Sequence, residues 1–162
     1  MRPSACAFAA ALLLAACASY DGRGLVPGQA TSADVERVMG RPTEKLAAPG
    51  GGETWFFPRA PEGRDTFAAR IGTDGRLASI EQTLTKENFA KVAEGKTTRE
   101  QLHALLGPPW KTWRTRLDLE EWDYRVKVDM RWYDYLVDFG PDGIVRTAYL
   151  LHDPFYDAPC AC

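Results

Sequence analysis

The sequence predicts an α+β protein made of two tandem units, each with one or two short helices packed on a three-stranded antiparallel meander. Two observations lead to this prediction: a glycine-bounded helix that occurs twice, and alternating strand patterns that follow each copy. The helix lies in "GQATSADVERVMGRPT" in the first copy and in "GKTTREQLHALLGPPW" in the second. We expect the two units to occupy residues 25–85 and 86–153.

The repeat extends beyond the helix. When Gly28 is aligned with Gly95, matching residues continue through both copies with a single one-residue shift. This self-similarity predicts tandem structural units of about 65 residues each. The aligned pairs are Thr31 with Thr98, Val35 with Leu102, Val38 with Leu105, Met39 with Leu106, Gly40 with Gly107, Pro42 with Pro109, Glu53 with Glu120, Trp55 with Trp122, Phe57 with Tyr124 and, after the shift, Phe67 with Tyr135, Ile71 with Phe139 and Gly72 with Gly140.

Each glycine-bounded helix has a physical start and stop. Thr31 and Thr98 stand where an N-cap is needed, and Thr98 with Gln101 has the spacing of a capping box. The apolar residues that follow recur at i, i+3 and i+4, which places them in one stripe on a helix. Gly40 and Gly107 then stand where helices commonly end with a positive φ, and prolines soon after prevent continuation.

Strand patterns follow both helices. In the second copy, "EEWDYRVKVDM" and "WYDYLVDFG" alternate apolar and polar residues, which predicts half-buried strands, and "IVRTAYLL" supplies a third strand after the turn "PDG". In the first copy, "TWFF", "TFAARI" and "RLASIEQ" occupy the same places. "TKENFAKVAEG" predicts one more short helix that starts near Thr85.

The first sixteen residues have the layout of a secretory signal peptide, with Arg2 followed by an apolar run too short to span a membrane. Leu14-Ala15-Ala16-Cys17 resembles the lipobox of bacterial lipoproteins, which implies cleavage before Cys17 and a diacylglycerol on its thiol. Residues 17–24 would then be a lipidated tether. Ala18 favours the outer membrane over retention in the inner one. The alternative is an ordinary cleaved signal with Cys17 as a bystander.

The order of the motifs resembles the SmpA/OmlA family of BamE-like outer-membrane lipoproteins. The residues that carry this resemblance are Gly95-Lys96-Thr97, Leu105-Leu106-Gly107-Pro108-Pro109, Trp122-Asp123-Tyr124 and Phe139-Gly140. The family implies a periplasm-facing role near the barrel-assembly machinery. Its members in barrel assembly usually have one copy of the unit, and the tandem arrangement here is more similar to the beta-lactamase inhibitory protein architecture. The shared motifs are core and turn positions, so neither resemblance supplies ligand-binding residues.

Several functions are not expected. The net charge of −2 gives no strong attraction to nucleic acid. His103 is expected on a solvated helix face, and His152 has no evident catalytic partners, so we predict no enzyme. Residues 154–162 are expected to form a C-terminal tail that contains Cys160 and Cys162. A zinc site needs about four ligands and this tail offers two thiols, so we expect no metal and no cofactor beyond the lipid. Glu120 and Glu121 are interpreted as a polar strand start.

The candidate partner-binding residues are aromatic, basic and apolar side chains near one face of the second meander. If that face is solvated, Trp132 and Leu136 form an exposed apolar patch on it, with Arg125 and Lys127 on the neighbouring strand, and such a patch is typical of a protein or lipid contact. The alternative is that helices or the other unit cover it. We hypothesise a non-catalytic binding role in envelope maintenance or outer-membrane protein assembly, and alternatively inhibition of a periplasmic or extracellular hydrolase. The candidates are Trp110, Trp113, Arg125, Lys127, Trp132 and Leu136.

Overall fold

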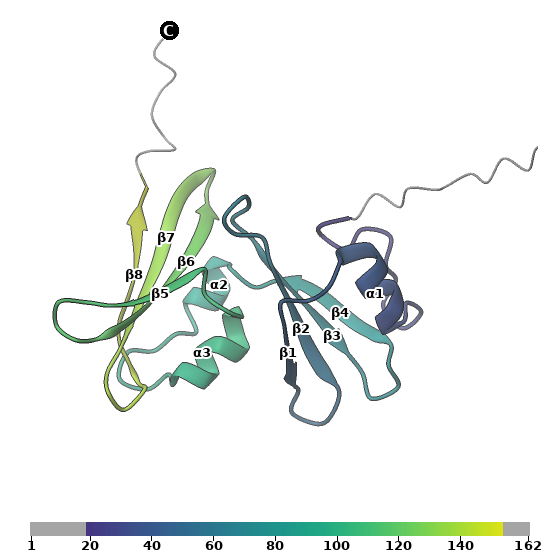
Figure 1. The fold of residues 1–162 in the computed structure, drawn as a ribbon, viewed down its shortest axis with the longest axis horizontal. Helices are drawn as coiled ribbons and strands as arrows, with labels where there is room; N and C mark the ends of the chain where they lie inside the picture. Colours follow the sequence, from purple (N-terminus) through teal and green to yellow (C-terminus); the bar gives the residue numbers. More distant parts are fainter. Residues whose placement is uncertain (1–18, 154–162) are drawn as a thin grey trace, which may run out of the picture.

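The computed structural model describes residues 19–153, and the predictions for the signal peptide, Cys17, Cys160 and Cys162 lie outside them. One helix precedes four strands, and then two helices precede four more (Figure 1). The elements are α1 (Ser32–Met39), β1 (Glu44–Ala47), β2 (Glu53–Pro58), β3 (Thr66–Ile71), β4 (Leu77–Gln82), α2 (Lys86–Phe89), α3 (Arg99–Leu106), β5 (Lys111–Arg114), β6 (Glu120–Val128), β7 (Arg131–Phe139) and β8 (Val145–His152).

The strands form two antiparallel sheets of four strands, each in chain order, β1-β2-β3-β4 and β5-β6-β7-β8. The mixed helix-and-sheet class is therefore as expected, but the prediction of three-stranded meanders is wrong. The missed strands, β1 and β5, are short edge strands. All four residues of β5 are exposed, and β1 alternates between half-buried and exposed residues. Neither strand has the apolar alternation by which a strand is recognised in a sequence.

The two glycine-bounded helices have nearly identical ends. The Thr98 hydroxyl accepts a hydrogen bond from the Gln101 N–H, and the Gln101 side chain accepts one from the Thr98 N–H, which confirms the capping box. Thr31 and Asp34 form the same box on α1. Gly40 and Gly107 end the helices at φ 86° and 87°. Thr85 caps α2, as expected, although α2 is a single turn.

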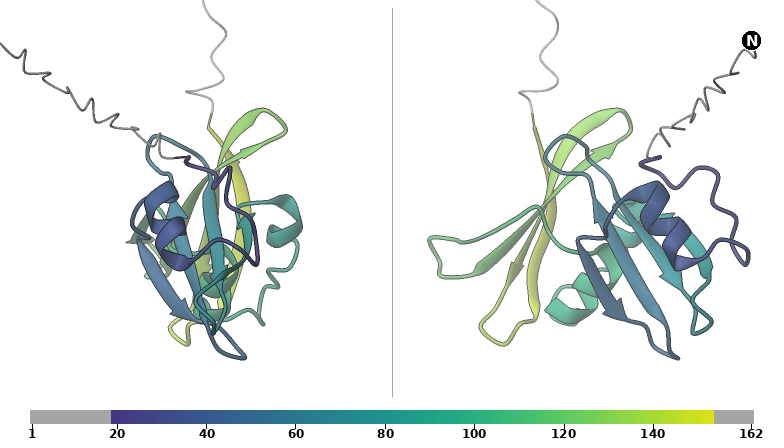
Figure 2. Two further views of the ribbon diagram at one scale, coloured as in Figure 1. Left: turned by 90° about the vertical axis from the view of Figure 1, so that its right-hand side faces the viewer. Right: turned by 45° about the vertical axis from the view of Figure 1, so that its right-hand side comes forward.

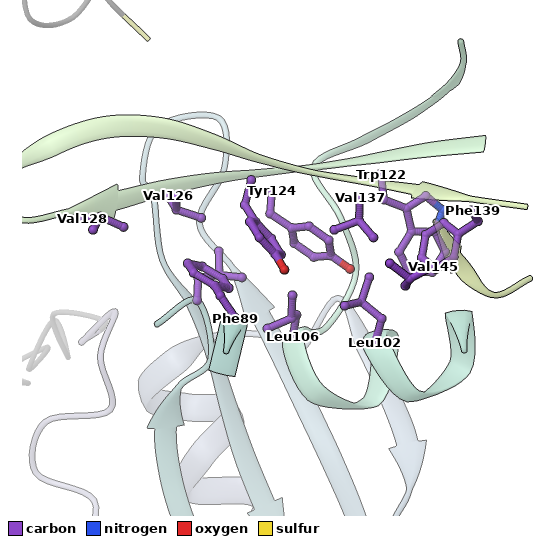
Figure 3. Close-up of a cluster of buried hydrophobic side chains, with 12 residues drawn as sticks. Phe89, Leu102, Leu106, Trp122, Tyr124, Val126, Val128, Val137, Phe139 and Val145 are labelled. Atoms are coloured by element: carbon purple, nitrogen blue, oxygen red, sulfur yellow. The ribbon is translucent and has the colours of Figure 1, made fainter. Parts of the chain in front are cut away.

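The elements stack in four layers, which are the sheet β5–β8, then α2 and α3, then the sheet β1–β4, then α1 (Figures 1 and 2). One apolar core lies between β5–β8 and the two middle helices, where Leu102 and Leu106 meet Tyr124 and Val137 (Figure 3). Phe89 of α2 stacks on Tyr135 with ring centroids 4.2 Å apart. A second core lies between α1 and β1–β4 and includes the aliphatic and aromatic residues of the first unit that align with those of the first core, such as Val35 and Trp55.

Helix α3 contacts both sheets. Its Leu106 carbonyl accepts a hydrogen bond from the Thr83 hydroxyl at 2.7 Å, and the Gly107 carbonyl accepts one from the Tyr124 hydroxyl at 3.1 Å. Phe56 of β2 is fully buried and lies on the α3 side of its sheet, opposite its neighbours in the core below α1. The sheet β1–β4 is thus covered on both faces, which explains why four consecutive residues of β2 are buried.

Residues 19–24, expected as part of a tether, pack instead against β3 and β4. The Tyr20 ring meets Phe67 edge-on with centroids 5.5 Å apart, and its hydroxyl donates to Asp65 at 2.8 Å. A Cβ on Gly22 would lie 2.5 Å from the Ile80 side chain, and Leu25 packs on the adjacent core. These contacts fix the segment on the domain. Within residues 19–153, no helix is long and apolar enough to cross a bilayer.

Candidate binding face

The sheet β5–β8 has one face turned away from α3, here called the open face, and no helix of the described chain lies over it (Figures 1 and 3). The strand register places the open-face side chains in rows across the sheet. One row crosses all four strands, and the next lies beside it. The first row is Trp113, Glu121, Asp138 and Thr147, and the second is Lys111, Asp123, Leu136 and Tyr149.

Two of the predicted binding residues lie together at the β5 side of the open face. The half-buried Trp110 ring lies between two cations, with Lys111 Nζ 3.9 Å and Arg125 Cζ 4.4 Å from its centroid. Arg125 also approaches Asp134 at 3.8 Å and Asp153 at 3.7 Å. Trp110 and Arg125 therefore stabilise one another, and neither presents a free surface. Trp113, by contrast, is 42% exposed.

Trp132 and Leu136 do not form the exposed apolar patch that the sequence suggested, and Lys127 is an exposed neighbour of Trp132. Trp132 is half-buried, and its ring has Arg64 Cζ at 5.0 Å and Lys127 Nζ at 5.3 Å. Arg64 comes from the β2–β3 loop, so the first half of the chain reaches this end of the face. Leu136 is only 6% exposed. The expected exposure of Trp132 and Leu136 is wrong. Arg64 of the other unit covers the Trp132 ring, which was the alternative expectation, and Leu136 is buried between Asp123 and Tyr149 in its row.

A different group of side chains occupies the centre of the open face. We call it the acidic–aromatic cluster and define it as Trp113, Glu121, Asp123, Asp138 and Tyr149. Glu121 and Asp123 are 7% and 2% exposed, whereas Trp113 and Tyr149 are 42% and 44% exposed. Two buried carboxyl groups thus lie on β6, in the same rows as two accessible aromatic residues on the edge strands. The interpretation of Glu121 as a polar strand start missed this cluster.

The carboxyl groups of the cluster are poorly compensated. Burial raises the pKa of Asp123 to about 7, and Asp134 adds to the rise, while Arg125 and Lys111 oppose it. Burial also raises the pKa of Glu121, and hydrogen bonding to Asp138 raises it further, whereas a hydrogen bond with Trp113 lowers it. Asp123 Oδ1 and Asp138 Oδ1 are buried without a hydrogen-bond partner. Such groups cost folding free energy and are typical of functional sites.

The histidines lie away from this cluster. His103 was expected on a solvated face, but its side chain is only 20% exposed and its Nε2 lies 3.0 Å from the Glu44 carboxylate. It contacts the rings of Phe56 and Trp122, so it belongs to the packing between the two sheets. His152 packs edge-on against Tyr133 with centroids 5.3 Å apart. Among residues 19–153, no three His, Cys, Asp or Glu side chains are placed to hold a metal ion.

Comparison with known proteins adds no assignment to this geometry. No protein-family model, curated protein or solved structure matches the chain.

Asp123 gives a testable pH dependence of stability. The pKa of Asp123 is about 7 in the folded state and about 4 in the unfolded chain. Between these two pH values the folded state keeps a proton that the unfolded chain has lost, so the free energy of unfolding decreases as the pH rises from about 4 to about 7. We expect Asp123→Asn to stabilise the protein by about 2 kcal/mol near pH 8 and to have little effect near pH 4. Urea unfolding at both pH values measures this. Asp118→Asn, at an exposed turn, is the control, and equal effects of Asp123→Asn at the two pH values would refute the expectation.

Proposed function

We propose that this chain is a periplasm-facing lipoprotein of the outer membrane that binds another envelope protein through the open face, without catalysis. The lipobox at Cys17 and the motif order that resembles the SmpA/OmlA family support the location and the tandem-unit assignment. The observation that carries the binding role is the open face itself. Trp113 and Tyr149 are accessible there, in the same rows as buried carboxyl groups, and Trp and Tyr are enriched among binding hot spots.

The packed segment that starts at Ser19 limits how far the domain can lie from the membrane. Tyr20 lies only three residues after Cys17, and an extended chain of that length reaches about 10 Å. Tyr20 is held by Asp65 and by Arg59, whose guanidinium donates to the Tyr20 carbonyl. An acyl chain on Cys17 would therefore hold the β2–β3 loop close to the bilayer, and the partner would be reached at or near the membrane surface.

The membrane anchor is tested by replacing the lipid-bearing cysteine. Cys17→Ala is expected to release the protein from outer-membrane fractions into the soluble periplasm, because the lipid provides the anchor. Cys162→Ala controls for the loss of a thiol and should leave the protein with the membrane. A Cys17→Ala protein that still fractionates with outer membranes would disprove the anchor.

The binding role is tested by crosslinking in intact cells. A photo-crosslinking residue at position 113 is expected to capture a protein of the barrel-assembly machinery. Capture of a soluble hydrolase instead would replace assembly with inhibition as the function.

A further inference from the structure

We propose that the acidic–aromatic cluster receives a cationic side chain, an arginine or a lysine, from the partner protein. This inference rests on the proposed function and adds the chemistry by which the open face recognises its partner. Its basis is a pair of buried carboxylate oxygens that lack donors and two accessible aromatic rings on either side of them.

The register places the carboxyl groups between the rings. Trp113 of β5 is directly opposite Glu121 of β6, which is opposite Asp138 of β7. In the adjacent row, Asp123 pairs with Leu136, which pairs with Tyr149 of β8. Directly opposed residues on neighbouring strands have Cβ atoms about 5 Å apart, so Glu121 and Asp138 are close neighbours. Asp123 lies in the adjacent row, and one aromatic residue lies toward each edge of the sheet.

Two carboxylate oxygens of the cluster have no hydrogen-bond donor, although Trp113 hydrogen-bonds to Glu121. Asp138 Oδ2 accepts a hydrogen bond from the Thr147 hydroxyl at 2.6 Å, but its Oδ1 is buried without a partner. Asp123 is only 2% exposed, and its Oδ1 also has no hydrogen-bond partner. Carboxylates accept and do not donate, so the group that would complete this site is a donor without acceptors. Guanidinium and ammonium groups have that property.

Two cations of the chain, Lys111 and Arg125, act on Asp123 electrostatically, but both also contact other groups. Lys111 Nζ lies over the Trp110 ring, and Arg125 lies against the same ring and near Asp134 and Asp153. A metal ion is disfavoured because no group of three ligating side chains in the described part of the chain is placed to hold one. An organic cation instead fits both halves of the cluster, since its charge pairs with carboxylates while aromatic faces attract it.

Protonation supplies an independent signature of cation binding. Asp134 and Glu121 raise the pKa of Asp123, whereas Arg125 and Lys111 lower it. Asp138 raises the pKa of Glu121, whereas Trp113 lowers it. A bound cation favours the ionised carboxylates, so binding releases protons. Affinity is therefore expected to fall as the pH is lowered through about 7 toward 5.

The experiment titrates N-acetylarginine methylamide into the intact chain in detergent micelles near pH 8, with the ¹⁵N–¹H NMR signal of the Trp113 indole as readout. N-acetylcitrulline methylamide, a neutral isostere, is the matched probe. We expect a saturable shift with arginine and at least about tenfold weaker binding of citrulline, because charge-assisted hydrogen bonds are lost. Glu121→Gln with Asp138→Asn should weaken arginine binding by about tenfold or more, whereas Glu81→Gln on the other sheet should not.

Three results would overturn the proposal. They are equal shifts with both probes, no Trp113 shift up to about 50 mM arginine probe, and unchanged affinity of the unmodified protein between about pH 8 and pH 5. The pH series uses the native sequence, so the test does not depend on folding of the double variant. If the arginine probe gives one of these results while position 113 still crosslinks to a partner, only the proposal of a cationic side chain is rejected. Loss of both would reject the open face as the binding surface.

Discussion

Replacing Gly107 with alanine is expected to destabilise the protein by about 4 kcal/mol, roughly twice the effect of the same change at Gly40. Both glycines end equivalent helices at nearly the same dihedral angles, φ 86° and ψ −171° for Gly40 and φ 87° and ψ −170° for Gly107. That region of φ/ψ space is essentially restricted to glycine, so alanine is strained at both positions, by about 2 kcal/mol.

The two positions differ in what surrounds them. A Cβ at Gly40 would have no heavy atom within 4 Å, whereas a Cβ at Gly107 would lie 2.6 Å from Cδ1 of Phe56. The extra loss at Gly107, about 2 kcal/mol, therefore measures the packing of α3 against the sheet β1–β4. Urea unfolding of both variants provides the comparison. Equal losses would mean that Phe56 does not pack tightly on the end of α3.

Arg64→Ala is expected to cost about 2 kcal/mol, because it removes one of the two arginines, Arg64 and Arg125, that lie near the half-buried carboxylates of Asp134 and Asp153. The Arg64 side chain is only 5% exposed and lies 3.2 Å from Asp134 and 3.3 Å from Asp153. It also covers the Trp132 ring. The substitution should raise Trp132 exposure as well, which fluorescence quenching by acrylamide would detect.

Arg70→Ala is the matched control for Arg64. Its pair with Glu81 has a short distance of 2.6 Å, but the two side chains are 53% and 47% exposed. Exposed ion pairs contribute at most about 1 kcal/mol, so the control should change stability little. Similar losses in the two variants would show that Arg64 does not join the β2–β3 loop to the open face.

Local features of the fold could be predicted from the sequence, because they depend on neighbouring residues. Thr98 with Gln101, and Gly107 after an apolar stripe, encode a helix with defined ends, and the structure has it. The exposed edge strands β1 and β5 were missed because their residues are nearly all polar or accessible. The burial of Phe56 could not be predicted either, because it depends on contact with the end of α3, which is distant along the chain.

The candidate site was less predictable, because it depends on register. Trp113 could be selected from the sequence as an aromatic residue just after the second glycine-bounded helix. Nothing local indicates that Glu121 faces Asp138, since their pairing is set by the β6–β7 hairpin. Leu136 had the phase of an exposed residue and is nevertheless buried, because four strands and long neighbouring side chains enclose it. Alternation alone therefore predicts which face a residue is on but not its exposure.

The central claim, that the open face binds an envelope protein, is tested most directly by photo-crosslinking in living cells from positions 113 and 37. Arg37 lies on α1, in the layer farthest from the open face, with 62% of its side chain exposed. We predict that position 113 captures a barrel-assembly protein, that Glu121→Gln with Asp138→Asn abolishes the capture, and that position 37 captures none. Capture of that protein from position 37 and not from position 113 would contradict the claim.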